Sequence, residues 1–146
     1  MSLKGRAIRY LAAREHSRAE LTRKLAPHAE SPEQVSQLLD ELEAKGLLSA
    51  QRFADAMLQR KAAKFGAARL QAELAQHQLP ADIAREAAQA LRDTEFERAH
   101  ALWVRRYGEI PESPEDKARQ MRFLAGRGFS SEVIRRVVRG EGFTHS

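Results

Sequence analysis

The histidines of this chain are not spaced for catalysis. The five of them are scattered, and no two lie three or four residues apart, the spacing that places two ligands on one helix face. The sequence has neither a His-Glu-x-x-His zinc motif nor a glycine-rich phosphate loop followed by Lys. It has no Cys, which excludes a disulfide, a thiolate zinc site and a cysteine nucleophile. We therefore expect no enzyme activity, no metal and no cofactor.

Carboxylates that could act as general acids or bases would have to converge on one point. Glu41 with Glu43, and Glu95 with Glu97, are examples of clustered carboxylates in this chain. Their spacing is typical of charged residues on the solvated face of a helix. We interpret both pairs as surface charge.

The basic residues are concentrated at the two ends of the chain, and the net charge is +5. Seven basic residues and two acids lie between Lys4 and Lys24, and seven basic residues and one acid lie between Lys117 and Arg139. The segment from Glu30 to Glu43 has five acids and no base. The basic ends favour a polyanion or an acidic protein as partner. Solvated basic helix faces, which are common, are the alternative.

The elements that must position these charges are all predicted to be helices, because Ala and Leu dominate and strand alternation is missing. A first helix over about 5–15 has Ile8, Leu11 and Ala12 on one face. The expected start signals are a Ser17 to Glu20 capping box, Ser31-Pro32, Leu79-Pro80, Ser113-Pro114 and Ser130. A fourth helix is expected over about 50–65, and a seventh from about 93 to Gly108. Gly46, Gly66 and Gly128 mark expected helix ends.

A weak apolar pattern recurs about every 50 residues. Leu21 and Leu25 reappear 49 residues later as Leu70 and Leu74, and Leu124 follows 50 residues after Leu74. A period of this length is typical of repeat proteins, in which each unit buries its apolar face against a neighbour. We predict an all-α protein of three tandem three-helix repeats, at 1–48, 49–92 and 93–140, with a frayed tail at 141–146. Such an array offers an extended surface rather than a pocket, which favours a binding protein.

Five aromatic residues flank basic ones, an arrangement seen where single-stranded nucleic acids stack. These are Phe65, Trp103, Tyr107, Phe123 and Phe129. Burial in the core is the alternative that we favour for most of them. Phe65 and Tyr107 each stand between a basic residue and a Gly, so we expect both at the corner of a repeat.

Three-helix units also suggest helix-turn-helix reading of DNA. The third helix of the first repeat bears Glu33, Asp40, Glu41 and Glu43, which would meet phosphates with like charge. Major-groove recognition by that helix is therefore disfavoured.

Three local strings resemble motifs of the RecX family of regulatory proteins. The first is Arg14-Glu15-His16-Ser17 with Glu20-Leu21 and Arg23-Lys24-Leu25. The second is Arg52-Phe53-Ala54, then Arg60, Phe65-Gly66 and Arg69-Leu70. The third is Arg106-Tyr107-Gly108, then Arg122-Phe123-Leu124 and Arg127-Gly128-Phe129-Ser130. They follow one another in order from about residue 5 to 139. Two positions depart from the family pattern: Ala67 stands where Pro is usual, and Met57 where an aromatic residue is common.

The resemblance implies an elongated, curved array that binds along the groove of RecA filaments on single-stranded DNA. It implies inhibition of strand exchange and of ATP hydrolysis by RecA, and modulation of the RecA co-protease in the SOS response. We expect a monomer. We expect it in the cytoplasm, since the sequence has no apolar run of 18 residues and no signal-peptide core.

The residues that we expect to contact RecA or DNA are basic. They are Arg14, Arg23, Lys24, Arg60, Lys64, Arg69, Arg119, Arg122, Arg127, Arg135 and Arg136. Arg14 and Arg127 could instead cap helix ends. The rival interpretation of the whole chain is a stand-alone helical module that binds nucleic acid without RecA.

Overall fold

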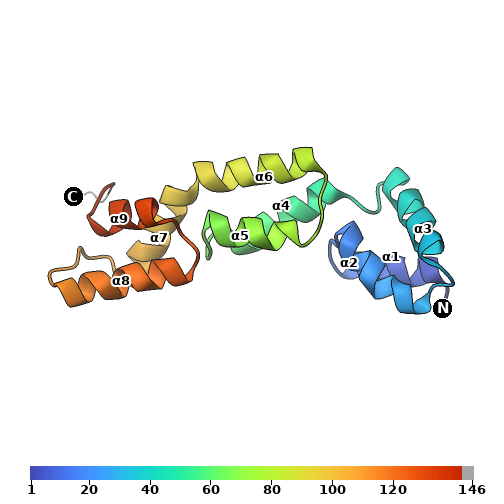
Figure 1. Cartoon of the computed structure of the whole chain (residues 1–146), viewed down its shortest axis with the longest axis horizontal. Coiled ribbons are helices and arrows are strands. Elements are labelled where there is room, and N and C mark those ends of the chain that lie inside the picture. Colours follow the sequence, from blue (N-terminus) through green and yellow to red (C-terminus); the bar gives the residue numbers. More distant parts are fainter. Residues whose placement is uncertain (143–146) are drawn as a thin grey trace. The chain divides into compact units, whose positions relative to one another are not determined.

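The computed structural model describes residues 1–142, and every regular element in them is helical (Figure 1). The elements are α1 (Leu3–Ala13), α2 (Arg18–Leu25), the 3₁₀ helix η1 (Ala26–His28), α3 (Pro32–Ala44), α4 (Ala50–Lys61), α5 (Ala67–Ala75), α6 (Ala81–Asp93), α7 (Glu95–Arg106), α8 (Pro114–Gly126) and α9 (Ser131–Val138). Over these residues the predicted all-α class is confirmed. No helix within residues 1–142 has the length and hydropathy needed to cross a bilayer.

Contacts group the chain into two compact units. The first comprises Met1–Met57 with Leu74–Arg85, and the second comprises Leu58–Glu73 with the chain from Glu86 onward. The division into three repeats at residues 48 and 92 stays a prediction. Most of the expected frayed tail, with His145, lies outside the described residues.

Four helices begin at the serine residues that the sequence indicated. The Ser17 side chain accepts a hydrogen bond from the Glu20 N–H, and the Glu20 side chain accepts one from the Ser17 N–H, which is the predicted capping box. Ser31, Ser113 and Ser130 cap α3, α8 and α9 in the same way through their side chains. The start signals were therefore correct at these four positions.

Two helix ends differ from the sequence-based expectation. Helix α4 ends at Lys61 rather than near Phe65, and the chain continues to Phe65 in turns. The guanidinium of Arg98 donates to the carbonyls of Ala62 and Phe65 at 2.7 and 2.6 Å, which supplies those carbonyls with donors that a longer helix would have provided. The 3₁₀ helix η1 was not expected; its Pro27 has no N–H with which to extend the α2 ladder.

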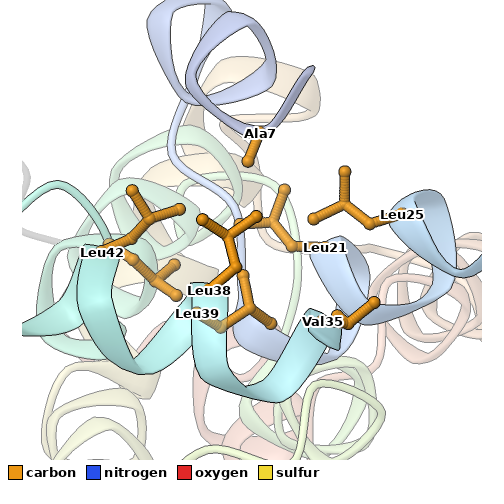
Figure 2. Close-up of a cluster of buried hydrophobic side chains, with 8 residues drawn as sticks. Ala7, Leu21, Leu25, Val35, Leu38, Leu39 and Leu42 are labelled. Atoms are coloured by element: carbon orange, nitrogen blue, oxygen red, sulfur yellow. The ribbon is translucent and has the colours of Figure 1, made fainter. Parts of the chain in front are cut away.

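The first unit is built on leucines from α2 and α3. Figure 2 shows Leu21 and Leu25 of α2 facing the side chains of α3, with Ala7 of α1 above them. The cluster comprises Ala7, Leu21, Leu25, Val35, Leu38, Leu39, Leu42 and Leu48. The buried face of α1 is rotated from the expected one, because Ile8 is 41% exposed whereas Ala7 is fully buried. A small side chain at position 7 lets α1 approach α2 closely.

The second unit has its own core between α7, α8 and α9. Trp103 is fully buried there, and its indole N–H donates to the side-chain oxygen of Gln120 at 2.7 Å. Trp103 and Phe129 are therefore core residues, as favoured from the sequence. The repeating leucines at 21, 25, 70, 74 and 124 are all buried. The 50-residue period thus marks positions that are packed inside the protein.

Candidate anion-binding surface

Glu95 is a buried carboxylate, which corrects its interpretation as surface charge. It is 6% exposed, and its two oxygens accept hydrogen bonds from the Ala67 N–H at 2.8 Å and the Ser130 N–H at 2.9 Å. Ala67 is the first residue of α5 and Ser130 precedes α9, so one side chain of α7 satisfies donors at two helix starts. Because a carboxylate already occupies the start of α5, an external anion has no place at that end.

Arg98, one turn after Glu95 on α7, fixes the corner between α4 and α5. It donates to the carbonyls of Ala62, Phe65 and Leu91 and is partly buried. Burial lowers the pKa of Arg98, and the charge of Glu95 partly offsets this. The guanidinium still stays charged at any physiological pH. Together, Glu95 and Arg98 hold the Phe65-Gly66 corner against α7.

Phe65 at this corner begins a row of alternating aromatic rings and guanidiniums, which we call the arginine–aromatic strip. Its members are Phe65, Arg69, Arg106, Tyr107, Phe123 and Arg127, all in the second unit. They come from the α4–α5 corner, the end of α7 and the end of α8. Segments far apart in the sequence therefore build one surface.

Distances along the strip are those of cation–π contacts. The Arg69 guanidinium carbon lies 4.0 Å from the centre of the Phe65 ring, and that of Arg127 lies 5.7 Å from the same ring. Arg127 and Arg106 each lie 5.3 Å from the centre of the Phe123 ring. Neighbouring guanidiniums thus share a ring.

Tyr107 closes the strip beside Phe123. The two rings meet edge to face, with centres 5.7 Å apart and an angle of 83° between their planes. Arg106 lies 5.9 Å from the Tyr107 ring as well. All three aromatic rings of the strip are half-buried.

None of the three strip arginines forms an ion pair with a described carboxylate. Arg69 donates to the Gly126 carbonyl at 3.3 Å, and Arg127 donates to the Lys64 carbonyl at 3.4 Å. Both hydrogen bonds are long. Since each guanidinium has five N–H groups, most of the donors on the strip remain available to an external anion.

The structure brings together two of the eleven basic side chains expected at the interface, and the backbone of a third residue. Arg69 and Arg127 belong to the strip, and the backbone of Lys64 adjoins it. Arg106 was missed as a site residue. Its signal was the order basic–aromatic–glycine, which Arg106-Tyr107-Gly108 shares with Lys64-Phe65-Gly66.

Two of the three expected residues in the first unit are engaged within it. Arg14 pairs with Glu20 through two hydrogen bonds at 2.7 and 3.2 Å and is the C-cap residue of α1, which supports its structural alternative. Burial alone would raise the pKa of Glu20, but Arg14 and the Ser17 N–H hold it at about 2. The ammonium of Lys24 lies 2.9 Å from His16 Nε2. Arg23 is exposed and has no polar partner among residues 1–142.

The remaining expected residues lie on the second unit outside the strip. Arg119 pairs with Asp116 at 2.7 Å, and Arg136 pairs with Glu141 at 2.9 Å. Arg60, Arg122 and Arg135 are exposed and make no ion pair within the described part of the chain. Arg127 is also the C-cap residue of α8, which supports its structural alternative, and its contact with RecA or DNA stays a prediction.

No group of three or more described His, Asp or Glu side chains is arranged to hold a metal ion.

In the first unit, acidic side chains of helix α3 form ion pairs with basic residues. Arg18 pairs with Asp40 and Glu43, and Glu41 pairs with Lys4 and Lys45. The charges on α3 are therefore largely neutralised from inside the unit.

Comparison with known protein families matches two segments of the chain. Residues 4–42 match the model of the first three-helix domain of RecX, and residues 93–138 match that of its third three-helix domain. The regulatory protein RecX of Leptothrix cholodnii is 54% identical over 95% of this chain and 88% of its own length. That of Ralstonia nicotianae is 49% identical over 96% of this chain and 88% of its own.

Solved structures show the same fold at low sequence identity. The crystal structure of RecX from Lactobacillus salivarius superposes with a TM-score of 0.78 at 17% identity, covering 97% of this chain and 96% of that one. A second crystal structure of a regulatory protein RecX gives a TM-score of 0.73 at 21% identity, covering 92% of this chain and 70% of that one.

Proposed function

This chain belongs to the RecX family of regulatory proteins, and from that premise we propose that it binds the RecA filament assembled on single-stranded DNA. Binding there inhibits strand exchange and ATP hydrolysis by RecA and limits its co-protease activity in the SOS response. The protein acts as a monomer in the bacterial cytoplasm, without a cofactor.

The observation that supports this function best is the arginine–aromatic strip. Three guanidiniums that form no ion pair with a described carboxylate lie near shared rings. Guanidiniums held in this way can form hydrogen bonds to phosphates or to acidic side chains. A nucleoprotein filament presents both of these groups on each of its repeating subunits. In this proposal the strip contacts the filament, and the exposed Arg23, Arg60, Arg122 and Arg135 add weaker contacts.

Inhibition requires that the protein prefer one state of RecA. A ligand shifts an equilibrium only by the difference between its affinities for the two states. We propose that this protein binds the assembled, nucleotide-bound filament much more tightly than free RecA and blocks access of the homologous duplex to the groove.

The decisive experiment is a titration of this protein into a RecA-dependent ATPase assay on single-stranded DNA. Wild type is expected to suppress hydrolysis. The triple variant Arg69→Gln, Arg106→Gln and Arg127→Gln is expected to need at least tenfold more protein for the same effect. A control with equal charge loss is Arg85→Gln, Arg92→Gln and Arg105→Gln, whose side chains are exposed and lie outside the strip. Unchanged hydrolysis at saturating wild-type protein would refute the proposal.

A second measurement separates the regulator from a stand-alone nucleic-acid module. Binding to single-stranded DNA is compared with and without RecA at two salt concentrations. Weak binding that becomes strong when filament is present supports the regulator. Tight binding without RecA, with a steep salt dependence and no gain from filament, supports the module.

A further inference from the structure

We propose that the arginine–aromatic strip binds the phosphodiester backbone of single-stranded nucleic acid through its guanidiniums, and that the bases do not stack on its rings. This deepens the proposed function and rests on it, since it names the part of the filament that the strip contacts. From the sequence, base stacking on the aromatic residues was one alternative, and burial in the core was favoured for most of them.

Two of the three rings of the strip, Phe65 and Phe123, are each contacted by two guanidiniums. Base stacking needs a ring face open to solvent. The guanidinium of Arg69 lies 4.0 Å from the centre of the Phe65 ring, which is stacking distance, and Arg127 approaches that ring as well. Phe123 is contacted by Arg127 and Arg106 and by the Tyr107 ring, and it packs against the core of the second unit. What the strip presents outward is therefore mainly guanidinium.

The guanidiniums of the strip are arranged to bind anions. Contact with a ring restricts the motion of each guanidinium, so that less side-chain entropy is lost when a phosphate binds. Arg69 and Arg106 are exposed, and Arg127 is half-buried. By contrast, the guanidinium of Arg14 already donates two hydrogen bonds to Glu20, and that of Arg136 donates two to Glu141. A phosphate can occupy the strip without first displacing a carboxylate.

Charge density favours a polyanion as the occupant. Arg69 and Arg127 share Phe65, and Arg127 and Arg106 share Phe123, so three like charges follow one another across two rings. Their mutual repulsion is only partly screened at physiological salt, where the Debye length is about 8 Å. A chain with one negative charge per nucleotide neutralises such a row better than isolated acidic side chains do.

The test uses the full chain and fluorescence anisotropy at low salt with three labelled probes. They are an oligothymidylate, an abasic oligonucleotide of the same length, and a polyglutamate with the same number of charges. We expect the two oligonucleotides to bind within about twofold of each other and the polyglutamate at least tenfold more weakly. Each of Arg69→Gln, Arg106→Gln and Arg127→Gln should reduce the slope of log K against log salt by about 0.7.

Two variants distinguish the strip from general positive charge. Arg105→Gln removes the charge next to Arg106 from an exposed side chain outside the strip, and its salt slope should equal that of wild type. Phe123→Leu keeps an apolar side chain but removes the ring that two guanidiniums share. It should weaken binding of the intact and the abasic oligonucleotide by the same factor, and thermal unfolding shows whether the fold is kept.

Three results would overturn the inference. Binding of the abasic probe tenfold weaker than oligothymidylate would mean that bases stack. Binding of polyglutamate but of neither oligonucleotide would mean that the strip recognises acidic protein. Equal losses for Arg105→Gln and Arg106→Gln would mean that the charge acts diffusely. The RecA ATPase assay tests the proposed function separately from these three binding results. If the protein inhibits RecA but any of the three results is obtained, this inference fails and the proposed function stands. If the oligonucleotides bind as expected but RecA is not inhibited, the proposed function fails and this inference stands.

Discussion

The backbones of Gly66 and Gly128 touch. A β-carbon built on Gly66 would lie 2.2 Å from the carbonyl oxygen of Gly128, and the Gly66 N–H donates to the neighbouring Arg127 carbonyl at 2.8 Å. Gly128 itself has a φ of +89° and faces the β-carbon of Arg69. This close approach brings the α4–α5 corner to the end of α8, where Phe65 and Arg127 meet in the strip. Only residues without a side chain allow it.

Gly66→Ala is therefore expected to destabilise the protein by at least about 2 kcal/mol, because backbone atoms cannot yield to the added methyl. The measurement is urea unfolding followed by circular dichroism. Gly126→Ala is the matched control, since nothing lies within 4 Å of a β-carbon there and the residue is helical. It should be neutral or stabilising by up to about 1 kcal/mol. Equal stability of the two variants would contradict the close contact.

Removing the Glu95 carboxylate should cost stability through the backbone groups that it satisfies. Glu95→Ala leaves the N–H groups of Ala67 and Ser130 without their acceptor, at a cost of about 3 kcal/mol in unfolding free energy. Glu97→Ala, an exposed change on the same helix, should cost less than about 1 kcal/mol. Hydrogen exchange should show both N–H groups less protected in the Glu95 variant, and unchanged exchange would speak against the assignment.

His16 should make the protein less stable below neutral pH. It is 2% exposed, and burial lowers its pKa, as do the nearby charges of Arg14 and Lys24. Above the ordinary imidazole pKa of about 6.5, His16 is neutral in both the folded and the unfolded chain. Below it, the unfolded chain takes up a proton that folded His16 does not bind, so stability falls with pH until the folded pKa is reached.

The loss is at most about 1.4 kcal/mol per pH unit from this residue. Urea unfolding at pH 7.5 and 5.5 measures it, and His16→Gln should flatten the pH dependence. His28→Gln, a change at an exposed histidine, should leave it unchanged. An NMR titration in which His16 protonates above pH 6.5 would disprove this account.

The neighbouring arginines of α9 are expected to respond differently to charge reversal. Arg135 is exposed without a described partner, whereas Arg136 pairs with Glu141 and lies 4.3 Å from the Phe96 ring centre. Arg136→Glu should therefore lower the thermal midpoint, and Arg135→Glu should not. If Arg135 contacts the filament, its reversal should raise the half-inhibitory concentration in the RecA ATPase assay by roughly threefold to tenfold. Wild-type inhibition by that variant would remove Arg135 from the interface.

Local signals in the sequence determined most of the fold. Serine caps at 17, 31, 113 and 130 begin four helices, and the buried leucines recur at the predicted spacing. Such features depend on hydrogen bonds within one turn and on apolar periodicity, both of which act over a few residues. The family motifs and the excess of basic residues were also legible in the sequence. They favour an anionic partner, which stays a prediction.

Only the tertiary structure decided which charges can meet a ligand. The sequence does not distinguish Arg14, Arg127 and Arg136. In the structure, Glu20 accepts hydrogen bonds from Arg14, and Glu141 accepts them from Arg136. Arg127 instead contacts the rings of Phe65 and Phe123. Glu95 has the spacing of a surface acid but is buried against two N–H groups. Arg127 contacts both Phe65 and Phe123, which are far apart in the sequence. Whether a guanidinium is free to bind an external anion therefore depends on residues that are distant in the sequence. Sequence spacing describes one helix at a time, and so it cannot determine contacts made between helices.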